Sequence, residues 1–383
     1  MLCVGEYVIH NFASMININS LYLSLTKLYY FFQAPLFNKF ALPPLQAFFD
    51  VTYRCNLRCN MCHSLSLIED SAAPDNNKKE LTAEQIIKII RQLPRNTLIT
   101  FTGGEPFLRK DMVDILTSTC KNYKCHIITN GTLIDEETAN SLIELRVRSL
   151  IRPGLMMIGV SLEGPEEIHD EIAIKKGSFQ KTISAIKLIQ KKKEQLRSRY
   201  PMIHLTTVIT SRSVPHLNFI YSLAKDLRLD YCNFVLENTS VFSRDHQVNN
   251  FSPLYQSPIS PSKIDPELLR SQLERLEGFA SHNSTPKIRF SPVKISHREI
   301  VRYYSTGLNP KDYRCYAPWV KIGFSAFGDV ICCPHIKIGN TLESNYDTLW
   351  NSLPYKTFRK KLKKEKSFPG CLGCCYSEYV GRK

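Results

Sequence analysis

The sequence lacks the uninterrupted run of about 18 apolar residues that a membrane-crossing helix requires. Polar side chains break its most aromatic and leucine-rich stretch, residues 16–37, and no basic region or small-residue cleavage site accompanies it, which argues against a secretory signal. Apolar residues recur in this stretch at helical spacing, so we expect an amphipathic helix packed on the main domain. Contact with a membrane surface is the alternative, which we do not favour. Met1 and Met15 are both candidate starts, because residues 1–14 show little pattern.

The sequence also lacks the features of a secreted disulfide scaffold. Such scaffolds are short, whereas this chain has 383 residues, enough for two domains or one large domain with an appendage. A 43% hydrophobic and 22% charged composition argues against a disordered or fibrous chain. The thirteen cysteines are odd in number, and nine of them fall into two tight groups. This pattern favours metal or cluster ligation in a reducing compartment, so we expect a cytoplasmic protein.

Acidic residues are too few to balance the basic ones, and the formal net charge is +15. Residues 181–199 and 356–366 each carry seven basic residues and one acidic residue, so the two runs supply +12 of the excess. Apolar residues interleave with these charges at helical spacing, which predicts solvated helix faces. Neither run has the aromatic platforms of a nucleic-acid site, so we do not expect a nucleic-acid partner. Anionic lipid or a reductant such as flavodoxin is the alternative partner for these faces.

Short apolar runs alternate with helical patterns between residues 46 and 240. The strand-like runs are residues 45–53, 98–103, 126–131, 157–164, 203–210 and 231–238. The helical patterns are residues 82–93, 111–122, 135–146, 178–196 and 215–228. Six strands joined by helices predict an α/β fold of parallel βα units, an incomplete (β/α)6 barrel of the TIM type. Chemistry in such barrels gathers at the carboxyl ends of the strands, where the unusual residues of this sequence fall.

The remaining segments frame this barrel. The expected domains are an N-terminal extension with the amphipathic helix (1–45), the partial barrel (46–240), a linker and helix (241–310) and a cysteine-rich module (311–383). Prolines and polar residues over 241–262 predict a linker or lid, followed by a helix at about 265–280 and a strand near 287–290. The last segment is too small to bury a large core unaided, which is typical of modules held together by metal.

Cys55, Cys59 and Cys62 form a C-x3-C-x2-C run directly after the first predicted strand. Three thiolates can converge on one inorganic core, and a four-iron cluster has four corners, so one iron would keep no protein ligand. A structural zinc site would be closed by a fourth thiolate or imidazole, and the adjacent His63 is geometrically awkward for that role. We therefore predict a [4Fe-4S] cluster with an open iron, with a zinc knuckle as the alternative.

This run resembles the signature of the radical S-adenosylmethionine (SAM) superfamily, and three later blocks extend the resemblance over residues 46–240. Residues 102–106 (TGGEP) are similar to the family's GGEP motif, and residues 129–131 (TNG) end the third strand as in many members. Residues 161–179, which contain SLEGP, HD and GSF, resemble the family's fourth-strand block. The resemblance implies that the open iron binds SAM, that reduction cleaves SAM to methionine and a 5′-deoxyadenosyl radical, and that this radical abstracts a substrate hydrogen.

The resemblance also suggests contacts for SAM. The candidates are Gly103, Gly104 and Glu105 for the amino end, Asn130 at the third strand's end, Ser161 for the carboxylate or ribose, and Thr206 and Val208 for the adenine. Two glycines let the backbone approach a ligand, and carbonyls or an acid accept ammonium hydrogens. The sequence departs from the family at two places. Glu163 stands where many relatives have Asp, and only Lys175 and Lys176 lie where many have an arginine for the SAM carboxylate.

A second group of cysteines lies in the last segment. Its predicted ligands are Cys315, Cys333, Cys371 and Cys374. The alternating run over residues 320–333 predicts a β-hairpin that brings the first two together at its open end. This segment resembles the SPASM/twitch module of radical SAM enzymes, in the shorter twitch form with one auxiliary [4Fe-4S] cluster. Cys332 and Cys375 are alternative ligands to their neighbours, and a zinc ribbon is the alternative site.

The other thiols and the strand histidines carry no functional prediction. We read Cys3, Cys120, Cys125 and Cys232 as ordinary thiols, and His126 and His204 as structural histidines.

Together these features predict a radical SAM enzyme whose auxiliary cluster assists oxidation or modification of a peptide or protein side chain. The alternatives are an enzyme acting on a small molecule (a sugar, nucleoside or lipid precursor) and, more remotely, a non-enzymatic zinc or iron–sulfur protein. An electron donor such as flavodoxin or ferredoxin is expected. The 45 residues before the barrel are too few for a separate leader-binding domain. An open groove between barrel and module would favour a peptide, and a closed pocket would favour a small molecule.

Overall fold

The computed structural model describes residues 41–72, 79–149, 151–237, 250–256, 261–280, 285–333 and 336–381. The helix expected within residues 16–37 and most of the linker expected at 241–262 lie outside these ranges. In the part of the chain that is described, no helix has the length and apolar character needed to cross a membrane.

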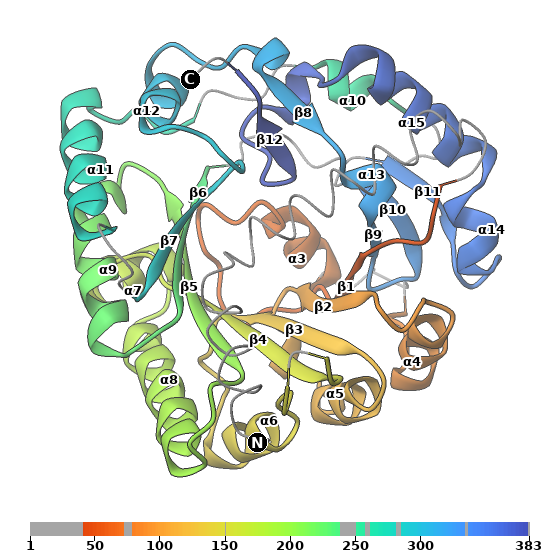
Figure 1. Ribbon diagram of the computed structural model, residues 1–383, viewed down its shortest axis with the longest axis horizontal. Coiled ribbons are helices and arrows are strands. Elements are labelled where there is room, and N and C mark those ends of the chain that lie inside the picture. Colours follow the sequence, from red (N-terminus) through yellow and green to blue (C-terminus); the bar gives the residue numbers. More distant parts are fainter. Residues whose placement is uncertain are drawn as a thin grey trace, which may run out of the picture.

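A ten-stranded sheet in the order β11-β10-β9-β1-β2-β3-β4-β5-β6-β7 curves around the centre of the molecule (Figure 1). Its parallel strands are β1 (Gln46–Thr52), β2 (Leu98–Gly103), β3 (Lys124–Thr129), β4 (Gly154–Ser161), β5 (Met202–Ile209), β6 (Tyr231–Leu236) and β7 (Lys287–Ser291). The six predicted barrel strands are confirmed. The strand predicted near 287–290 also forms, but it pairs with β6 as a seventh strand of the barrel instead of belonging to a linker.

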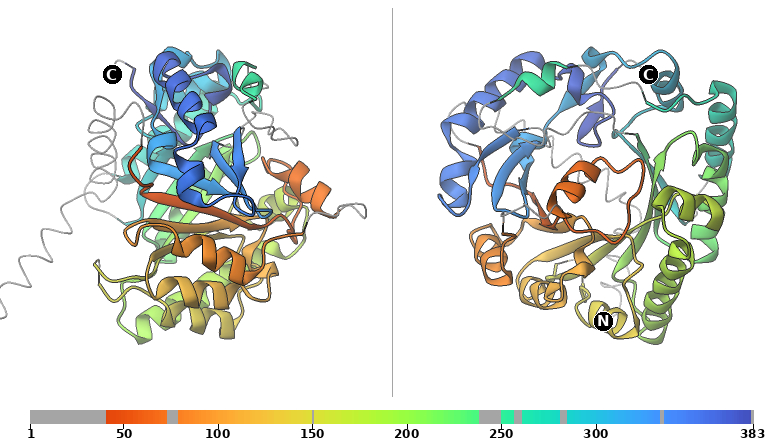
Figure 2. Two further views of the ribbon diagram at one scale, coloured as in Figure 1. Left: turned by 90° about the vertical axis from the view of Figure 1, so that its right-hand side faces the viewer. Right: turned by 180° about the vertical axis from the view of Figure 1, so that it is seen from behind.

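Helices cover the outer face of this sheet (Figures 1 and 2). The predicted ones are α4 (Ala83–Arg91), α5 (Met112–Cys120), α6 (Glu136–Glu144), α8 (Ser178–Gln195), α9 (Leu217–Asp226) and α11 (Pro266–Ala280). Further helices are α3 (Leu65–Ala72), α7 (Glu166–Ala173), α10 (Ser252–Tyr255) and α12 (His297–Ser305). A capping box starts α4, because Gln85 N donates to Thr82 Oγ1 and Thr82 N donates to Gln85 Oε1.

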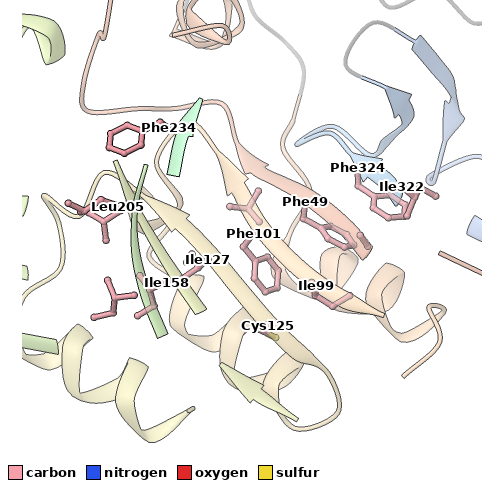
Figure 3. Close-up of a cluster of buried hydrophobic side chains, with 14 of the residues drawn as sticks. Phe49, Ile99, Phe101, Cys125, Ile127, Ile158, Leu205, Phe234, Ile322 and Phe324 are labelled. Atoms are coloured by element: carbon pink, nitrogen blue, oxygen red, sulfur yellow. The ribbon is translucent and has the colours of Figure 1, made fainter. Parts of the chain in front are cut away.

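Burial alternates along the barrel strands and separates two faces. On β1 the side chains of Phe49 and Val51 are 2% and 1% exposed and join the core under the helices, whereas Phe48 and Asp50 keep partial exposure. The same alternation holds on β3, where His126 is partly exposed. Figure 3 shows the outer layer, in which aromatic and aliphatic side chains of neighbouring strands pack together. The inward-facing side chains therefore line a lumen that solvent reaches.

The cysteine-rich module is built onto the edge of the barrel sheet. Its elements are β8 (Tyr313–Cys315), α13 (Ala317–Val320), β9 (Lys321–Phe324), β10 (Asp329–Cys333), β11 (Ile336–Asn340), α14 (Tyr346–Trp350), α15 (Leu353–Glu365) and β12 (Ser377–Tyr379). The predicted hairpin is β9–β10, and Gly328 takes the left-handed φ of +85° in its turn. The strand β9 pairs in parallel with β1.

The module also contacts the far edge of the barrel. Just after β7, Val293 N donates to Ser377 O (3.2 Å), and Tyr379 N donates to Val293 O (2.9 Å). Because β9 lies beside β1 and β12 lies beside the end of β7, the module spans the interval between the two barrel edges (Figure 1).

The two basic runs lie on α8 and α15, and most of their charged side chains are exposed, as predicted. Two members are buried. The Nζ atom of Lys193 lies 3.7 Å from Oδ2 of Asp230, and Arg359 donates to the carbonyls of Pro318 and Trp350. These two cations are structural members of runs that otherwise face solvent.

Candidate active site

Cys55, Cys59 and Cys62 lie in the loop that leaves the carboxyl end of β1. All three thiols are partly exposed. Burial raises the pKa of each, and it raises that of Cys59 to about 12 with help from the charges of Glu163, Cys62 and Cys55. The thiols are therefore near neighbours that stay protonated until a metal centre displaces their protons.

The sulfur atoms of these three thiols are not arranged as they would be around a single metal ion. Among the residues that the structure describes, no three His, Cys, Asp or Glu side chains converge closely enough to hold one metal ion. Thiolates that ligate different corners of a four-iron cluster are separated by the irons and sulfides between them. The three-thiol donor set of this loop fits such a cluster.

Backbone hydrogen bonds hold the cysteine loop on two sides. At the end of β2, Gly104 N donates to Thr52 O (2.7 Å) and Glu105 N donates to Arg54 O (2.9 Å). At the end of α7, the carbonyls of Ala173 and Ile172 accept from Arg58 N (3.3 Å) and Asn60 N (3.1 Å). The loop is thus fixed by the two chain segments that carry the GGEP-like block and the fourth-strand block.

The two glycines of the GGEP-like block are required by this close approach. A Cβ atom on Gly103 would lie 2.3 Å from Thr52 O, and one on Gly104 would lie 2.2 Å from Arg54 O. Gly103 also has a φ of +127°. We expected these glycines to let the backbone approach SAM; in the structure the backbone they admit is that of the cysteine loop.

Glu105 joins the ends of β2 and β3. Its carboxylate is fully buried and accepts hydrogen bonds from Phe107 N (3.1 Å), Thr129 Oγ1 (2.7 Å) and Asn130 N (2.7 Å). Burial raises its pKa to about 6 despite these donors. The Glu105 carboxylate therefore has protein partners. Its contact with the SAM amino group, which the resemblance suggests, stays a prediction.

Asn130 links the third strand to the cysteine loop. Its Nδ2 donates to Asn56 Oδ1 (3.0 Å), and its Oδ1 accepts from Thr132 N (2.9 Å). Because Asn56 lies directly after Cys55, the TNG block at the end of β3 also positions the cysteines.

Ser161, Thr206 and Val208 lie on the inward face of β4 and β5 and are partly exposed. Ser161 and Thr206 are register partners, so the structure brings these two predicted SAM contacts together. The backbone N–H of Val208 donates to Glu163 Oε2 (2.9 Å). The Val208 side chain is partly exposed on the inward face of β5.

Glu163, the residue that stands where many relatives have Asp, lies near Cys59. It is 4% exposed, and burial raises its pKa to about 8. An acid with this pKa is mostly protonated at neutral pH, so the structure places a neutral carboxyl group near the first cysteine group.

The HD and GSF residues of the fourth-strand block form one helix junction. The Asp170 carboxylate accepts from Ser178 Oγ (2.7 Å) and from the backbone N–H groups of Gly177 (2.5 Å) and Phe179 (2.8 Å) at the start of α8. These bonds lower the pKa of Asp170. Lys175 and Lys176, the cations nearest to the position of the absent arginine, are exposed.

The four predicted auxiliary ligands converge within the module. Cys315 ends β8, Cys333 ends β10, and Cys371 and Cys374 lie in and after the short helix η4 (Pro369–Cys371). Burial raises the pKa of Cys315, and the charges of Cys371 and Cys333 add to this effect. The hydrogen bond with Cys375 and burial raise the pKa of Cys374, and the charges of Cys371 and Cys315 add to this effect. Four thiolates would form a closed donor set of the kind that holds a cluster.

The two alternative cysteines differ in their surroundings. Cys332 is 3% exposed, and its thiol donates to Ile336 O (3.7 Å). Cys375 is exposed, and its thiol forms a hydrogen bond with that of Cys374. Cys375 is thus the nearer of the two alternatives to an assigned ligand.

The module reaches the barrel lumen beside β1. The ring of Tyr376 lies 5.5 Å from that of Phe48, and Lys321 Nζ lies 4.6 Å from the Tyr376 centroid. Asp50 accepts from Tyr53 Oη (3.2 Å), and burial raises its pKa to about 6. No motif identified Asp50 or Tyr376, because only the pairing of β9 with β1 brings the module to this strand.

Two family models match the chain. The radical SAM superfamily model matches residues 49–207, and an iron-sulfur cluster-binding domain model, SPASM, matches residues 315–375. An uncharacterised protein of Methanocaldococcus jannaschii is 30% identical over 309 residues, which cover 77% of this chain and 88% of that protein.

Relatives with named roles match different shares of the chain. The antilisterial bacteriocin subtilosin biosynthesis protein AlbA of Bacillus subtilis is 26% identical, over 88% of this chain and 68% of its own length. A cysteine-type anaerobic sulfatase-maturating enzyme of Clostridium perfringens is 27% identical, over 51% of this chain and 52% of its own. The AdoMet-dependent heme synthase of Oleidesulfovibrio alaskensis is 27% identical, over 46% of this chain and 42% of its own.

Two solved structures share the fold. Streptococcus suis SuiB bound to S-adenosylmethionine superposes with a TM-score of 0.59 at 16% identity, covering 85% of this chain and 68% of SuiB. The structure of anSMEcpe with bound AdoMet and a peptide gives 0.55 at 19% identity, with 82% of each chain covered. The chain therefore belongs to the radical SAM superfamily, and it is a radical SAM enzyme with a SPASM domain whose cofactors are SAM and [4Fe-4S] clusters, auxiliary clusters included.

Proposed function

We propose that this enzyme cleaves SAM reductively and uses the resulting radical to modify a side chain of a peptide or protein. The observation that carries the proposal is that both cysteine groups adjoin β1. The first group leaves the end of β1, and the auxiliary group belongs to a module whose Tyr376 contacts Phe48 on the same strand. A substrate in the lumen would lie near both.

The described residues suggest how the cofactors would be held. Cys55, Cys59 and Cys62 would ligate the first cluster, whose open iron would take the amino and carboxylate groups of SAM. The backbone at residues 103–105 would face the amino end, with Asn130, Ser161, Thr206 and Val208 along the rest of SAM. When bound, the cluster and SAM supply a 5′-deoxyadenosyl radical that abstracts a substrate hydrogen. An electron donor such as flavodoxin or ferredoxin would provide the reducing electron.

Cys315, Cys333, Cys371 and Cys374 would ligate one auxiliary [4Fe-4S] cluster, as in the twitch form of the module. The charge interactions among these thiols support this set. Such a cluster would supply a one-electron acceptor on the side of the lumen next to β1.

The coverage of the relatives supports a peptide substrate over a small molecule. The heme synthase matches less than half of this chain, whereas AlbA, named for bacteriocin biosynthesis, matches 88%. The solved structures that superpose over barrel and module include SuiB bound to its precursor peptide SuiA.

The first experiment counts metal and measures SAM cleavage. We expect anaerobically purified enzyme to hold about eight irons, four for each of two clusters, and to release 5′-deoxyadenosine after reduction. Cys59→Ala should lose about half of the iron and all deoxyadenosine formation, and Cys374→Ala should lose about half of the iron but keep some cleavage. Cys120→Ala is the matched control at a buried thiol outside both groups. Stoichiometric zinc with no deoxyadenosine would overturn the proposal.

The second experiment separates peptide from small-molecule substrates. Extracts of cells grown on deuterated medium are fractionated by size and incubated with enzyme and unlabelled SAM. A peptide substrate transfers deuterium to 5′-deoxyadenosine from a fraction that loses this ability after protease digestion. Transfer from a protease-resistant small-molecule fraction would favour the alternative instead.

A further inference from the structure

A row of polar side chains crosses four neighbouring strands on the lumen side. The register partners run from Ser161 on β4 to Thr206 on β5, Asn233 on β6 and Arg289 on β7. All four are partly exposed. The first two are predicted SAM contacts, whereas Asn233 and Arg289 have no role in the function proposed above.

A histidine pair fixes one side of this row. His204 Nδ1 lies 2.7 Å from Asn233 Nδ2 and 3.2 Å from Thr206 Oγ1, and His204 Nε2 lies 3.1 Å from His126 Nε2. Gly159 leaves room for both rings, since a Cβ there would lie 2.5 Å from His204 Cε1 and 3.3 Å from His126 Nε2. The Asn233 amide is thereby held with its nitrogen toward His204.

Two buried polar atoms at the far end of the row have no hydrogen-bond partner, Asn233 Oδ1 and Arg289 Nε. The guanidinium carbon of Arg289 lies 3.3 Å from the Tyr231 ring centroid, and Arg289 also forms a side-chain hydrogen bond with Tyr231, while its Nε atom has no partner. An unpaired acceptor and an unpaired cationic donor are both costly in a partly desolvated site, so a ligand that satisfies them binds with a gain in free energy.

Among the described residues, Asp230 is the carboxylate whose charge acts on Arg289. Asp230 is shared, because it also accepts from Ile203 N (2.8 Å) and lies 3.7 Å from Lys193 Nζ. The histidines stay neutral. Burial and the charge of Arg289 lower the pKa of His126 to about 4, and burial with the charges of His126 and Arg289 lowers the pKa of His204 well below its ordinary value. Within the described part of the chain, the row thus ends in a positive charge whose carboxylate neighbour is shared with Lys193.

We infer that Arg289 and Asn233 form a subsite for a carboxylate group of the substrate. This inference rests on the proposed peptide function and names a recognition element for it. A carboxylate matches the guanidinium edge, and an adjacent N–H matches Asn233 Oδ1. A peptide offers this pair either at an Asp or Glu residue or at its C-terminus.

Binding of small carboxylates tests the subsite without turnover. The probes are N-acetylglutamic acid α-amide, which carries a side-chain carboxylate, N-acetylglycine, which carries a terminal one, and the neutral N-acetylglutamine α-amide. The readout is the pKa of His126, followed by NMR of enzyme with labelled histidine and oxidised clusters. A carboxylate that neutralises Arg289 should raise this pKa by about half a unit or more, and the neutral probe should not. The carboxylate probe that binds more tightly identifies the source.

Variants separate recognition from structure. Arg289→Gln should raise the pKa of His126 by itself and weaken carboxylate binding at least tenfold. Arg289→Lys should keep the charge, and with it the low pKa, while weakening binding through loss of the planar fork. Arg270→Gln, at an exposed arginine of α11, is the control for net charge and should change neither.

Two results would overturn the inference. One is equal binding of the acidic and neutral probes, or of the acidic probes to wild type and Arg289→Gln. The other is a tenfold loss of SAM affinity in Arg289→Gln together with a SAM-induced rise in the pKa of His126, which would assign the carboxylate to SAM. Failure of the peptide function would appear separately, as absence of deuterium transfer with carboxylate binding intact.

Discussion

At the residue scale, the absence of a side chain at Gly104 allows the first cysteine loop to take its position. Because a Cβ at this position would lie 2.2 Å from Arg54 O, alanine must displace the loop that carries the first three cysteines. We expect Gly104→Ala to lose the iron of the first site and SAM cleavage, while the auxiliary iron stays. Iron analysis with electron paramagnetic resonance of the reduced protein measures both.

The matched control for this change is Gly278→Ala. A Cβ on Gly278, within α11, would meet no atom within 4 Å, so alanine should be neutral or should stabilise the helix by up to about 1 kcal/mol. Retention of full iron at the first site in Gly104→Ala would contradict the steric role of this glycine.

Glu105 makes a second residue-scale prediction, about pH. Its pKa is about 6 in the fold against an ordinary 4.5, so the folded protein binds this proton more tightly than the unfolded chain does. The free energy of unfolding should therefore fall as pH rises from about 4.5 to about 6, by roughly 2 kcal/mol, and then level off. Glu105→Gln, which does not titrate, should lack this fall.

At neutral pH the same variant should be less stable than wild type by about 1–3 kcal/mol, because an amide N–H₂ would face the N–H donors of Phe107 or Asn130. Anaerobic thermal melts at pH 5 and pH 7.5 measure both effects. Glu167→Gln, at an exposed glutamate of α7, is the control. An unchanged pH dependence in Glu105→Gln would show that other groups produce it.

The sequence could identify cysteines more readily than the polar residues around them. Thiol ligation restricts residue type and spacing, so seven cysteines could be proposed as ligands from the sequence. In the structure charge interactions link members of each group, and their role as ligands stays a prediction. Asp50, Asn233 and Arg289 lie on separate strands, and the order of those strands in the sheet is not contained in any local pattern. For Gly103 and Gly104 the sequence indicated a close approach but not the partner.

At the scale of elements, the junction of α7 and α8 connects barrel stability to the first cysteine group. Asp170 accepts three hydrogen bonds at the start of α8, and the last residues of α7 accept two from the cysteine loop. We expect Asp170→Ala to cost about 1–3 kcal/mol, since it leaves buried N–H groups unpaired. It should also reduce iron occupancy of the first site more than that of the auxiliary site.

Asp135→Ala is the control for this junction. Asp135 also caps a helix, α6, through one exposed bond to Thr138 N, so its loss should cost about 1 kcal/mol and leave both iron sites occupied. Equal iron loss in the two variants would show that general destabilisation, not the junction, is responsible. Melting temperature and iron content of both variants make the comparison.

The strands and helices that were predicted correctly are those whose hydrophobic pattern lies within a short stretch of sequence. The six barrel strands follow one another with a helix between, and each was predicted within a few residues of its bounds. The strand β7 was assigned to a linker because its pairing with β6 spans about fifty residues, and sequence proximity carries no information about that register. The short α7 was missed for another reason, since eight residues leave too little periodicity to recognise.

At the scale of the whole molecule, the module and the barrel share one sheet. The pairing of β9 with β1 makes the hairpin a continuation of the barrel, and Val293 joins the end of β7 to β12 on the other side. Removing the module would uncover the β1 edge, and unpaired edges are costly. We therefore expect the two parts to unfold together although they bind different clusters.

Phe324 tests this coupling. It is fully buried on β9, and its ring stacks on that of Phe49 of β1 with centroids 4.5 Å apart. Phe324→Ala should cost about 3–5 kcal/mol, and because the sheet is continuous, barrel and module should melt in one transition at a lower temperature, releasing iron from both sites together. Phe219→Ala, at a ring 40% exposed on α9, should cost much less. If calorimetry of Phe324→Ala instead resolved a module transition well below an unshifted barrel transition, the shared sheet would not couple the two parts.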